Sequence, residues 1–241
     1  MTSRPLISIV TITFNAAATL PATMKSVAGQ TFTDYEHILI DGASSDGTLG
    51  IARSNPYMRI LSEKDNGLYD AMNKGLRLAR GKYVLFLNSG DTFRTPEVLA
   101  RYAERAAEDY DIIYSDTMVV DAEGNDIKPR HHSVPERLTF ESFSKGMLVC
   151  HQAFMVKAAI APQYDLSYRF SADYDWTIKC IKKTSPDRCC NLKTVGINYL
   201  ADGTTDHNKV KSLLERYRIM SRHYGKLSTF AHHVKLVLGL R

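Results

Sequence analysis

Two residue patterns alternate through the first half of the chain, and this alternation restricts the fold more than any other feature of the sequence. Short runs of apolar, β-branched residues predict strands, at 6–14, 36–42, 58–64 and 82–88. The segments that follow these runs have helical patterns, at 17–29, 47–54, 67–81 and 95–109, the last with Thr95 as its expected cap and Pro96 as its first residue. Such alternation predicts an α/β fold, a mixed, mainly parallel sheet flanked by helices, with ligands at the carboxyl ends of the strands.

The second half of the chain follows a different pattern. Residues 111–127 predict two antiparallel strands around a turn at 123–125. Later elements are expected as helices at 135–146 and 171–183 and a strand at 194–203. The last expected helix, 207–225, has an apolar stripe made of Val210, Leu213, Leu214, Tyr217 and Met220. We expect one domain over residues 1–206, with halves meeting near residue 110, and a helical tail at 207–241.

Composition limits the class of protein. With 241 residues, of which 44% are hydrophobic, the chain can bury one sizeable core. No apolar run reaches the roughly 20 residues that cross a membrane, and no signal-peptide cleavage site follows the N-terminus, so we expect a cytoplasmic protein. The four cysteines, at 150, 180, 189 and 190, lack the spacing of a zinc site, which favours buried, reduced thiols.

Positive charge is concentrated in the tail. Residues 207–241 contain eight Lys or Arg and one acid, Glu215, so the tail contributes +7 to the net charge of +5, and the rest of the chain contributes −2. A nucleic-acid partner is not expected, because the tail lacks interleaved aromatic residues and a Gly-rich platform. An anionic membrane surface and an anionic lipid-linked substrate fit equally well. The alternative is a helix packed on its own domain with a solvated outer face.

Polar residues gather where the first four predicted strands end. The clusters are at 13–15, 41–48, 63–67 and 88–91. Any one of them could be an ordinary turn, since turns favour Asp, Asn, Gly and Ser, but four clusters on one sheet edge predict a site. The chain has no phosphate-binding P-loop, no dinucleotide fingerprint and no nucleophile elbow. Acids in their place favour a ligand with hydroxyls, a nucleobase or a divalent cation.

Four segments carry a resemblance to a known family. The runs "SIVTITFNAAATL", "ILIDGASSDGT", "EKDNGLYDAMNKGLRLARGKYVLFLNSGD" and "SADYDW" resemble the family 2 glycosyltransferases of the GT-A (Rossmann-like) fold, most closely bacterial exopolysaccharide transferases similar to those that build colanic acid. The resemblance covers residues 6–205. It implies an inverting hexosyltransferase that moves a sugar from a nucleoside-diphosphate sugar, most often a UDP-sugar, to a hydroxyl of a saccharide acceptor linked to undecaprenyl diphosphate.

The resemblance implies which residues grip the donor. Asp41 occupies the family position whose carboxylate accepts a hydrogen bond from the base, although an Asx-turn within its own loop is the alternative. Thr13 and Asn15 flank the same pocket. Asp65 matches a carboxylate found beside the base and ribose, and Asn88 belongs to the same nucleotide-sugar-binding set.

The metal motif departs from the family pattern. Relatives often read Asp-x-Asp-Asp where residues 88–91 read "NSGD", so Asp91 is the one remaining carboxylate for Mn2+ or Mg2+. A second ligand could be His207, whose alternative is a solvated residue at a helix start. Without a metal, Lys74 and Lys209 are the candidates to neutralise the diphosphate.

The resemblance also implies a catalytic base and an acceptor side. Asp173 sits where the family has its catalytic Asp, with Ala172 in place of the usual Glu; a helix-capping role is the alternative. Trp176 lies on the same helix face and could stack on a sugar or belong to the core. His151 and Gln152 are expected on the acceptor side, with a buried, hydrogen-bonded histidine as the alternative.

The tail and the incomplete metal motif leave two questions for the structure. The tail helix and the short apolar end after it could lie on a bilayer but not cross it, so we expect peripheral contact with the inner face of the cytoplasmic membrane. The incomplete motif raises a competing hypothesis, a catalytically silent subunit that binds nucleotide sugar. A nucleotidyltransferase is disfavoured, because no Gly-rich, basic loop follows the first strand.

Overall fold

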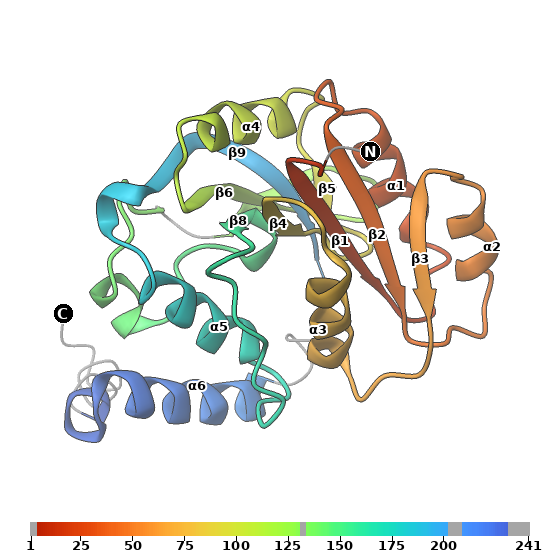
Figure 1. The fold of residues 1–241 in the computed structure, drawn as a ribbon. Helices are drawn as coiled ribbons and strands as arrows, with labels where there is room; N and C mark the ends of the chain where they lie inside the picture. The colour runs from red at the N-terminus through yellow and green to blue at the C-terminus, as the bar shows by residue number, and fades with distance from the viewer. Residues whose placement is uncertain (1–3, 131–133, 202–208, 231–241) are drawn as a thin grey trace.

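The computed structural model describes residues 4–130, 134–201 and 209–230 of the chain (Figure 1). The strands are β1 (Ile7–Thr13), β2 (Tyr35–Asp41), β3 (Met58–Ser62), β4 (Tyr83–Phe86), β5 (Thr92–Phe93), β6 (Ile112–Val120), β7 (Asp126–Pro129), β8 (Phe154–Lys157) and β9 (Cys189–Leu200). The α-helices are α1 (Leu20–Ala28), α2 (Thr48–Arg53), α3 (Leu68–Leu78), α4 (Val98–Ala107), α5 (Ala172–Ile181) and α6 (Lys209–Tyr224). Three short 3-10 turns are η1 (Glu141–Lys145), η2 (His151–Ala153) and η3 (Pro186–Arg188).

One curled, mixed sheet runs through the molecule. Its strand order is β3-β2-β1-β4-β8-β6-β9-β5, with β7 paired to β6. β1 to β4 are mutually parallel, as the alternating pattern predicts, whereas β8 is antiparallel to both β4 and β6. The register pairs Thr13 with Asp41 and Asp41 with Ser62, so the polar clusters after β1, β2 and β3 meet at one edge.

The core joins the two halves of the domain. Every residue of β1 and β4 is buried, and both strands contribute to one apolar cluster that also contains the inner faces of α4, β6, β8 and α5. The Phe86 ring of β4, for example, lies edge-on to Trp176 of α5, with ring centroids 6.1 Å apart. Each fully buried large apolar side chain of this kind contributes about 1.5–3 kcal/mol of burial free energy.

Two predicted helices are wrong in extent. The helix expected at 95–109 begins at Val98 with Glu97 at its N-cap, because the Thr95 and Pro96 carbonyls accept hydrogen bonds from Gln30 and Thr31 of the loop after α1. The helix expected at 135–146 is reduced to η1. There Thr139 and Ser142 exchange side-chain to backbone hydrogen bonds, which compete with helix formation.

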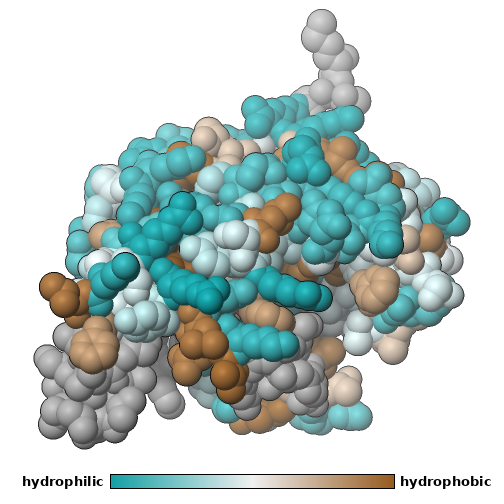
Figure 2. Space-filling model, turned by 90° about the horizontal axis from the view of Figure 1, so that it is seen from below, coloured by the Kyte–Doolittle hydropathy of each residue, from teal (hydrophilic) through white to brown (hydrophobic). Residues whose placement is uncertain are grey.

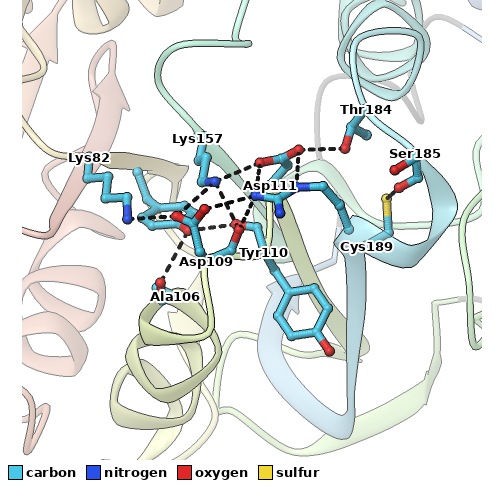
Figure 3. A network of polar contacts seen from close by, with 11 residues as sticks. Lys82, Ala106, Asp109, Tyr110, Asp111, Lys157, Thr184, Ser185 and Cys189 are labelled. Atoms are coloured by element: carbon cyan, nitrogen blue, oxygen red, sulfur yellow. Dashed lines mark hydrogen bonds and ion pairs between the residues drawn. The ribbon is translucent and has the colours of Figure 1, made fainter.

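An ion network lies at the end of the sheet opposite the polar clusters (Figure 3). Asp109 and Asp111, between α4 and β6, bind Lys82 before β4, Lys157 at the end of β8 and Arg188 of η3. The closest of these contacts joins Lys157 Nζ to Asp111 Oδ1 at 2.7 Å. Four segments that are distant in sequence are thereby tied together at the base of the sheet.

Helix α6 packs against the rest of the chain through Ser212, Ile219 and Met220, which are buried. Val210, Leu213 and Leu214 of the expected apolar stripe are 73%, 56% and 58% exposed, whereas Met220 of the same stripe is buried. Most of the stripe therefore faces away from the core. No helix in the described part of the chain is both long and apolar enough to cross a membrane.

Candidate active site

The loops after β1 and β2 are joined to each other by polar contacts. Asn15, in the left-handed backbone region at φ 48°, donates its backbone N–H to Ser44 Oγ at 2.8 Å. Its side-chain oxygen accepts the Ser45 N–H at 2.9 Å. Asn tolerates this backbone conformation better than most residues, because its short polar side chain can bond locally. The two loops therefore form one rigid rim at the carboxyl end of the sheet.

Asp41 is the most heavily bonded residue of this rim. Its buried carboxylate accepts hydrogen bonds from Thr13 Oγ1 at 3.2 Å, from Ser62 Oγ at 2.7 Å, and from the backbone N–H and hydroxyl of Ser44. Burial raises the pKa of this carboxyl group, but the hydrogen bonds together outweigh burial and hold the pKa below its ordinary value. Asp41 thus holds its own loop, as the Asx-turn interpretation expects, and organises the rim as a permanent anion.

Asp65 and Lys74 lie on the β3 side of the rim. Asp65 accepts the Gly67 N–H at 2.9 Å, and a Cβ atom on Gly42 would stand 2.6 Å from its other oxygen. Asp65 therefore lies against the Asp41 loop, as a pocket shared with Asp41 requires. The buried Lys74 Nζ donates to the Lys64 carbonyl at 2.9 Å and pairs with Glu63 at 3.0 Å. In this structure Lys74 is neutralised locally.

Asn88 and Asp91 follow β4. The buried Oδ1 atom of Asn88 has no hydrogen-bond partner in the described part of the chain. Asp91 is buried and accepts a hydrogen bond from the Leu200 backbone N–H at 3.0 Å, and the Gln152 side chain lies nearby. Burial raises its pKa to about 7, against the opposing effects of the Leu200 bond and the Arg130 charge.

The donor set around Asp91 does not fit Mn2+ or Mg2+ by itself. No group of three His, Cys, Asp or Glu side chains suitable for a metal occurs in the described ranges, 4–130, 134–201 and 209–230. One Asp91 oxygen is bonded to Leu200, Arg130 lies near enough to influence its charge, and the neighbouring position is Gly90. The predicted second ligand, His207, lies outside the described residues, as does the side chain of Lys209.

Asp173 is the half-buried acid of an otherwise buried helix turn. From Ser171 to Ile178 every other residue is buried. Its Oδ1 accepts a hydrogen bond from the Tyr69 hydroxyl of α3 at 3.0 Å. Asp175 faces elsewhere, bonding His223 at 2.7 Å and Lys179 at 2.6 Å, as its place on another helix face predicts. The contact between Asp173 and Tyr69 joins α5 to the end of α3 that follows the rim.

The three residues expected to contact the acceptor or a sugar, His151, Gln152 and Trp176, are all buried. Trp176 is fully buried and donates its indole N–H to the Pro162 carbonyl at 2.7 Å, so it has no exposed face on which a sugar could stack. His151 Nε2 lies 2.6 Å from the Tyr164 hydroxyl, and burial lowers the pKa of His151 to about 4. The core interpretations of Trp176 and His151 match this placement, and Gln152 lies near Asp91.

Sequence reasoning missed three residues that organise the site. Tyr69 lies in the helix predicted at 67–81, and the helical spacing does not mark it as a site residue. Tyr164 exchanges hydrogen bonds with Asn73 of α3 through its backbone, at 2.7 Å and 3.1 Å, and no local pattern announces this contact. Glu215 bonds three consecutive backbone N–H groups at 169–171, and its signal was that it is the one acid in a basic tail.

Comparison with known proteins identifies relatives with this arrangement. The sequence model described as Glycosyl transferase family 2 matches residues 8–162. A protein named PGL/p-HBAD biosynthesis glycosyltransferase, from Mycobacterium bovis (strain BCG / Pasteur 1173P2), is 36% identical over 189 residues, which are 73% of this chain and 70% of that protein. The family expected from the sequence motifs is confirmed by these two matches.

Two solved structures share the fold. TarS 1-349 of S. aureus, in complex with UDP, superposes with a TM-score of 0.71 at 17% identity, covering 90% of this chain and 64% of that one. The mannosyltransferase PcManGT from Pyrobaculum calidifontis, in complex with GDP-Man and Mn2+, gives a TM-score of 0.64 at 14% identity, covering 98% and 76%. The expected GT-A fold is confirmed, and at these identities the likeness extends to the fold alone.

Proposed function

The chain belongs to glycosyltransferase family 2 and is an enzyme that transfers sugars, and from this premise we propose that it is an inverting transferase of the hexosyltransferase type. Its donor is a nucleoside-diphosphate sugar, with a UDP-sugar as the first candidate. Its acceptor is a lipid-linked saccharide, and its product serves polysaccharide or glycolipid synthesis.

The observation that carries the mechanism is that Asp173 is half-buried while its neighbours on α5 are buried. In an inverting transfer, a base takes the proton from the acceptor hydroxyl, the oxygen attacks the anomeric carbon, and the nucleoside diphosphate leaves from the opposite side. Asp173 has one oxygen bonded to Tyr69, and no described residue donates a hydrogen bond to its Oδ2. Oδ2 is therefore the atom that we assign to proton transfer.

We assign the donor nucleotide to the rim. Thr13, Asn15, Asp41 and Asp65 line its β1 to β3 side, and Asn88 follows β4. UDP is the first candidate because TarS was solved with UDP, while GDP-Man in PcManGT makes GDP the necessary comparison. Calorimetric titration with UDP and with GDP decides between them.

The leaving diphosphate raises the question of a metal. When bound, Mn2+ or Mg2+ would neutralise the charge that develops on the phosphates, and Asp91 with His207 would be the candidate ligands. The bond that Asp91 already makes favours nucleotide binding that is largely independent of metal. The titrations are therefore run with and without Mn2+: a large gain in UDP affinity with Mn2+ contradicts this assignment, and equal affinities support it.

Helix α6 supports a lipid-linked acceptor. Its outer face exposes Val210, Leu213 and Leu214, and the exposed cations Lys211 and Arg218 accompany them. Figure 2, drawn from below, shows brown clusters bordered by teal on the side where α6 lies in Figure 1. Apolar side chains flanked by cations suit the surface of an anionic bilayer. We therefore propose peripheral contact with the inner face of the cytoplasmic membrane.

Point variants test the membrane contact without disturbing the fold. Leu213→Glu with Leu214→Glu should reduce flotation with liposomes that contain anionic lipid. Ile127→Glu on β7, an exposed apolar residue far from α6 in sequence, is the matched control and should float as the wild type does. Equal flotation of all three proteins would remove α6 from the proposal.

The decisive test of the function replaces the base. Asp173→Asn should bind UDP as the wild type does but lose roughly 10²–10⁴-fold in sugar transfer, the usual contribution of a general base. Asp34→Asn, an exposed acid on the loop before β2, is the control. If the wild type binds the nucleotide but transfers no sugar, the hypothesis of a catalytically silent subunit replaces that of an enzyme. Asn88 and Gly90, which stand where relatives often have carboxylates, favour that hypothesis.

A further inference from the structure

We propose that Tyr69 is a positioning residue for Asp173, binding one carboxylate oxygen and turning the second toward the acceptor. This inference rests on the proposed function, in which Asp173 is the base. Tyr69 is the second residue of α3, and Asp173 is the second residue of α5. Their contact joins the helix that follows the donor rim to the helix that carries the base.

The contact between the two residues is a hydrogen bond. The Tyr69 hydroxyl donates to Asp173 Oδ1 at 3.0 Å. This bond fixes the rotation of the Asp173 side chain at the start of α5 and leaves Oδ2 free to face the acceptor.

Stacked rings hold Tyr69 in place. Its ring stacks on Tyr164 with centroids 5.7 Å apart, and Tyr164 stacks on Trp176 at 5.0 Å with an interplanar angle of 12°. Tyr69 is 6% exposed, so its ring cannot leave this stack without opening the core. Trp176 and His151 both contact Tyr164, Trp176 by stacking and His151 by a hydrogen bond. They therefore help to hold the ring on which Tyr69 stacks.

The surroundings of Tyr69 keep its hydroxyl protonated. Burial, followed by the negative charge of Asp173, raises the pKa of Tyr69 well above its ordinary value, so the phenol stays protonated and can donate. Removing the hydroxyl leaves Asp173 Oδ1 without this donor, so the carboxylate is no longer held in one rotation.

The experiment is steady-state sugar transfer by Tyr69→Phe. The kcat should fall roughly tenfold, since hydrogen bonds to charged groups have effects of this order. The KM for the donor should stay unchanged, because the phenol contacts α5 and not the rim. A misfolded variant would not keep the wild-type KM and UDP affinity.

Tyr102→Phe is the matched control. Tyr102 is also a buried tyrosine on a helix, and its hydroxyl bonds Ser115 and the Ala153 carbonyl at 2.9 Å each, away from Asp173. It should lose some stability and keep the wild-type kcat. A Tyr69→Phe enzyme with the wild-type kcat overturns the positioning role while leaving Asp173 as the base. Full activity of Asp173→Asn overturns the proposed function itself, whatever Tyr69→Phe does.

Discussion

Replacing Glu215 should destabilise the domain and loosen the segment that leads into α5. Its Oε1 accepts the backbone N–H of Arg169 at 2.8 Å, and its Oε2 accepts those of Phe170 and Ser171 at 2.7 Å and 2.9 Å. These three donors belong to the turn immediately before the helix that carries Asp173. A single carboxylate of α6 therefore caps that turn from outside.

The loss of stability in Glu215→Ala depends on how many of these three N–H groups can bind water instead. The bond to Arg169 is exposed, so water replaces it at little cost, whereas the bonds to Phe170 and Ser171 are partly buried. Losing these two in Glu215→Ala should lower the free energy of unfolding by about 2–3 kcal/mol, at about 1–1.5 kcal/mol per bond. For a chain of this size, the melting temperature should fall by roughly 5–10 °C.

The assay is urea and thermal unfolding of Glu215→Ala beside Glu104→Ala, an exposed glutamate of α4. Hydrogen exchange adds a local readout, because the amides of Phe170 and Ser171 should exchange faster in Glu215→Ala than in the wild type. Glu215→Gln keeps one acceptor oxygen and should lose about half as much stability. If Glu215→Ala unfolds at the same urea concentration as Glu104→Ala, the capping role assigned to Glu215 is wrong.

Two further predictions concern the rest of the fold. Burial would raise the pKa of Asp111, but hydrogen bonds from Arg188, Lys157 and Thr184 lower it to about 2, and the pKa of Asp109 is also lowered, through hydrogen bonds from Lys82, Lys157 and Arg188. Because these folded pKa values lie below the unfolded value of about 3.8, the network stabilises the fold above about pH 4 and loses this effect toward pH 2. The urea midpoints of wild type and Arg188→Met should therefore differ most at pH 7 and converge in acid; a constant difference would contradict the network. A Cβ atom on Gly75 would stand 2.4 Å from Val10 Cγ1, so Gly75→Ala should cost about 1–3 kcal/mol of unfolding free energy through overpacking. Gly50→Ala, on α2 with open space around it, should instead gain about 0.5–1 kcal/mol, and a gain in both variants would contradict the close approach of α3 to β1.

The strand and helix order could be predicted from the sequence because burial imposes it locally. β1 and β4 are buried along their whole length, so each reads as an unbroken apolar run. The antiparallel pair β6 and β7 was also predictable from its turn and is confirmed. Residues 95 and 96 were misread, since no local signal tells that their carbonyls bind a loop some 65 residues earlier.

The positions of the polar residues in the candidate site could be predicted from the sequence. Which of them bind the rest of the protein and which face a ligand could not. Asp41 and Asp91 were expected to face a ligand, but the structure shows both buried and bonded to the protein. A carboxylate that organises a loop and one that binds a substrate look alike in a sequence. Asp173 differs because its neighbours are buried on all sides, and that contrast appears only once α5 is packed.

The attachment of α6 through Glu215 bears on any attempt to shorten the chain. Cutting after residue 201 would separate the sheet from α6, the helix that we propose to contact the membrane. The cut would also strip the carboxylate from the turn at 169–171 and remove Ser212, whose hydroxyl lies 2.9 Å from that of Ser171. Loss of activity in the truncated enzyme would then reflect a displaced start of α5 and not the loss of a membrane contact. Membrane dependence can be measured only in the full-length protein, by changing residues on the outer face of α6 one at a time.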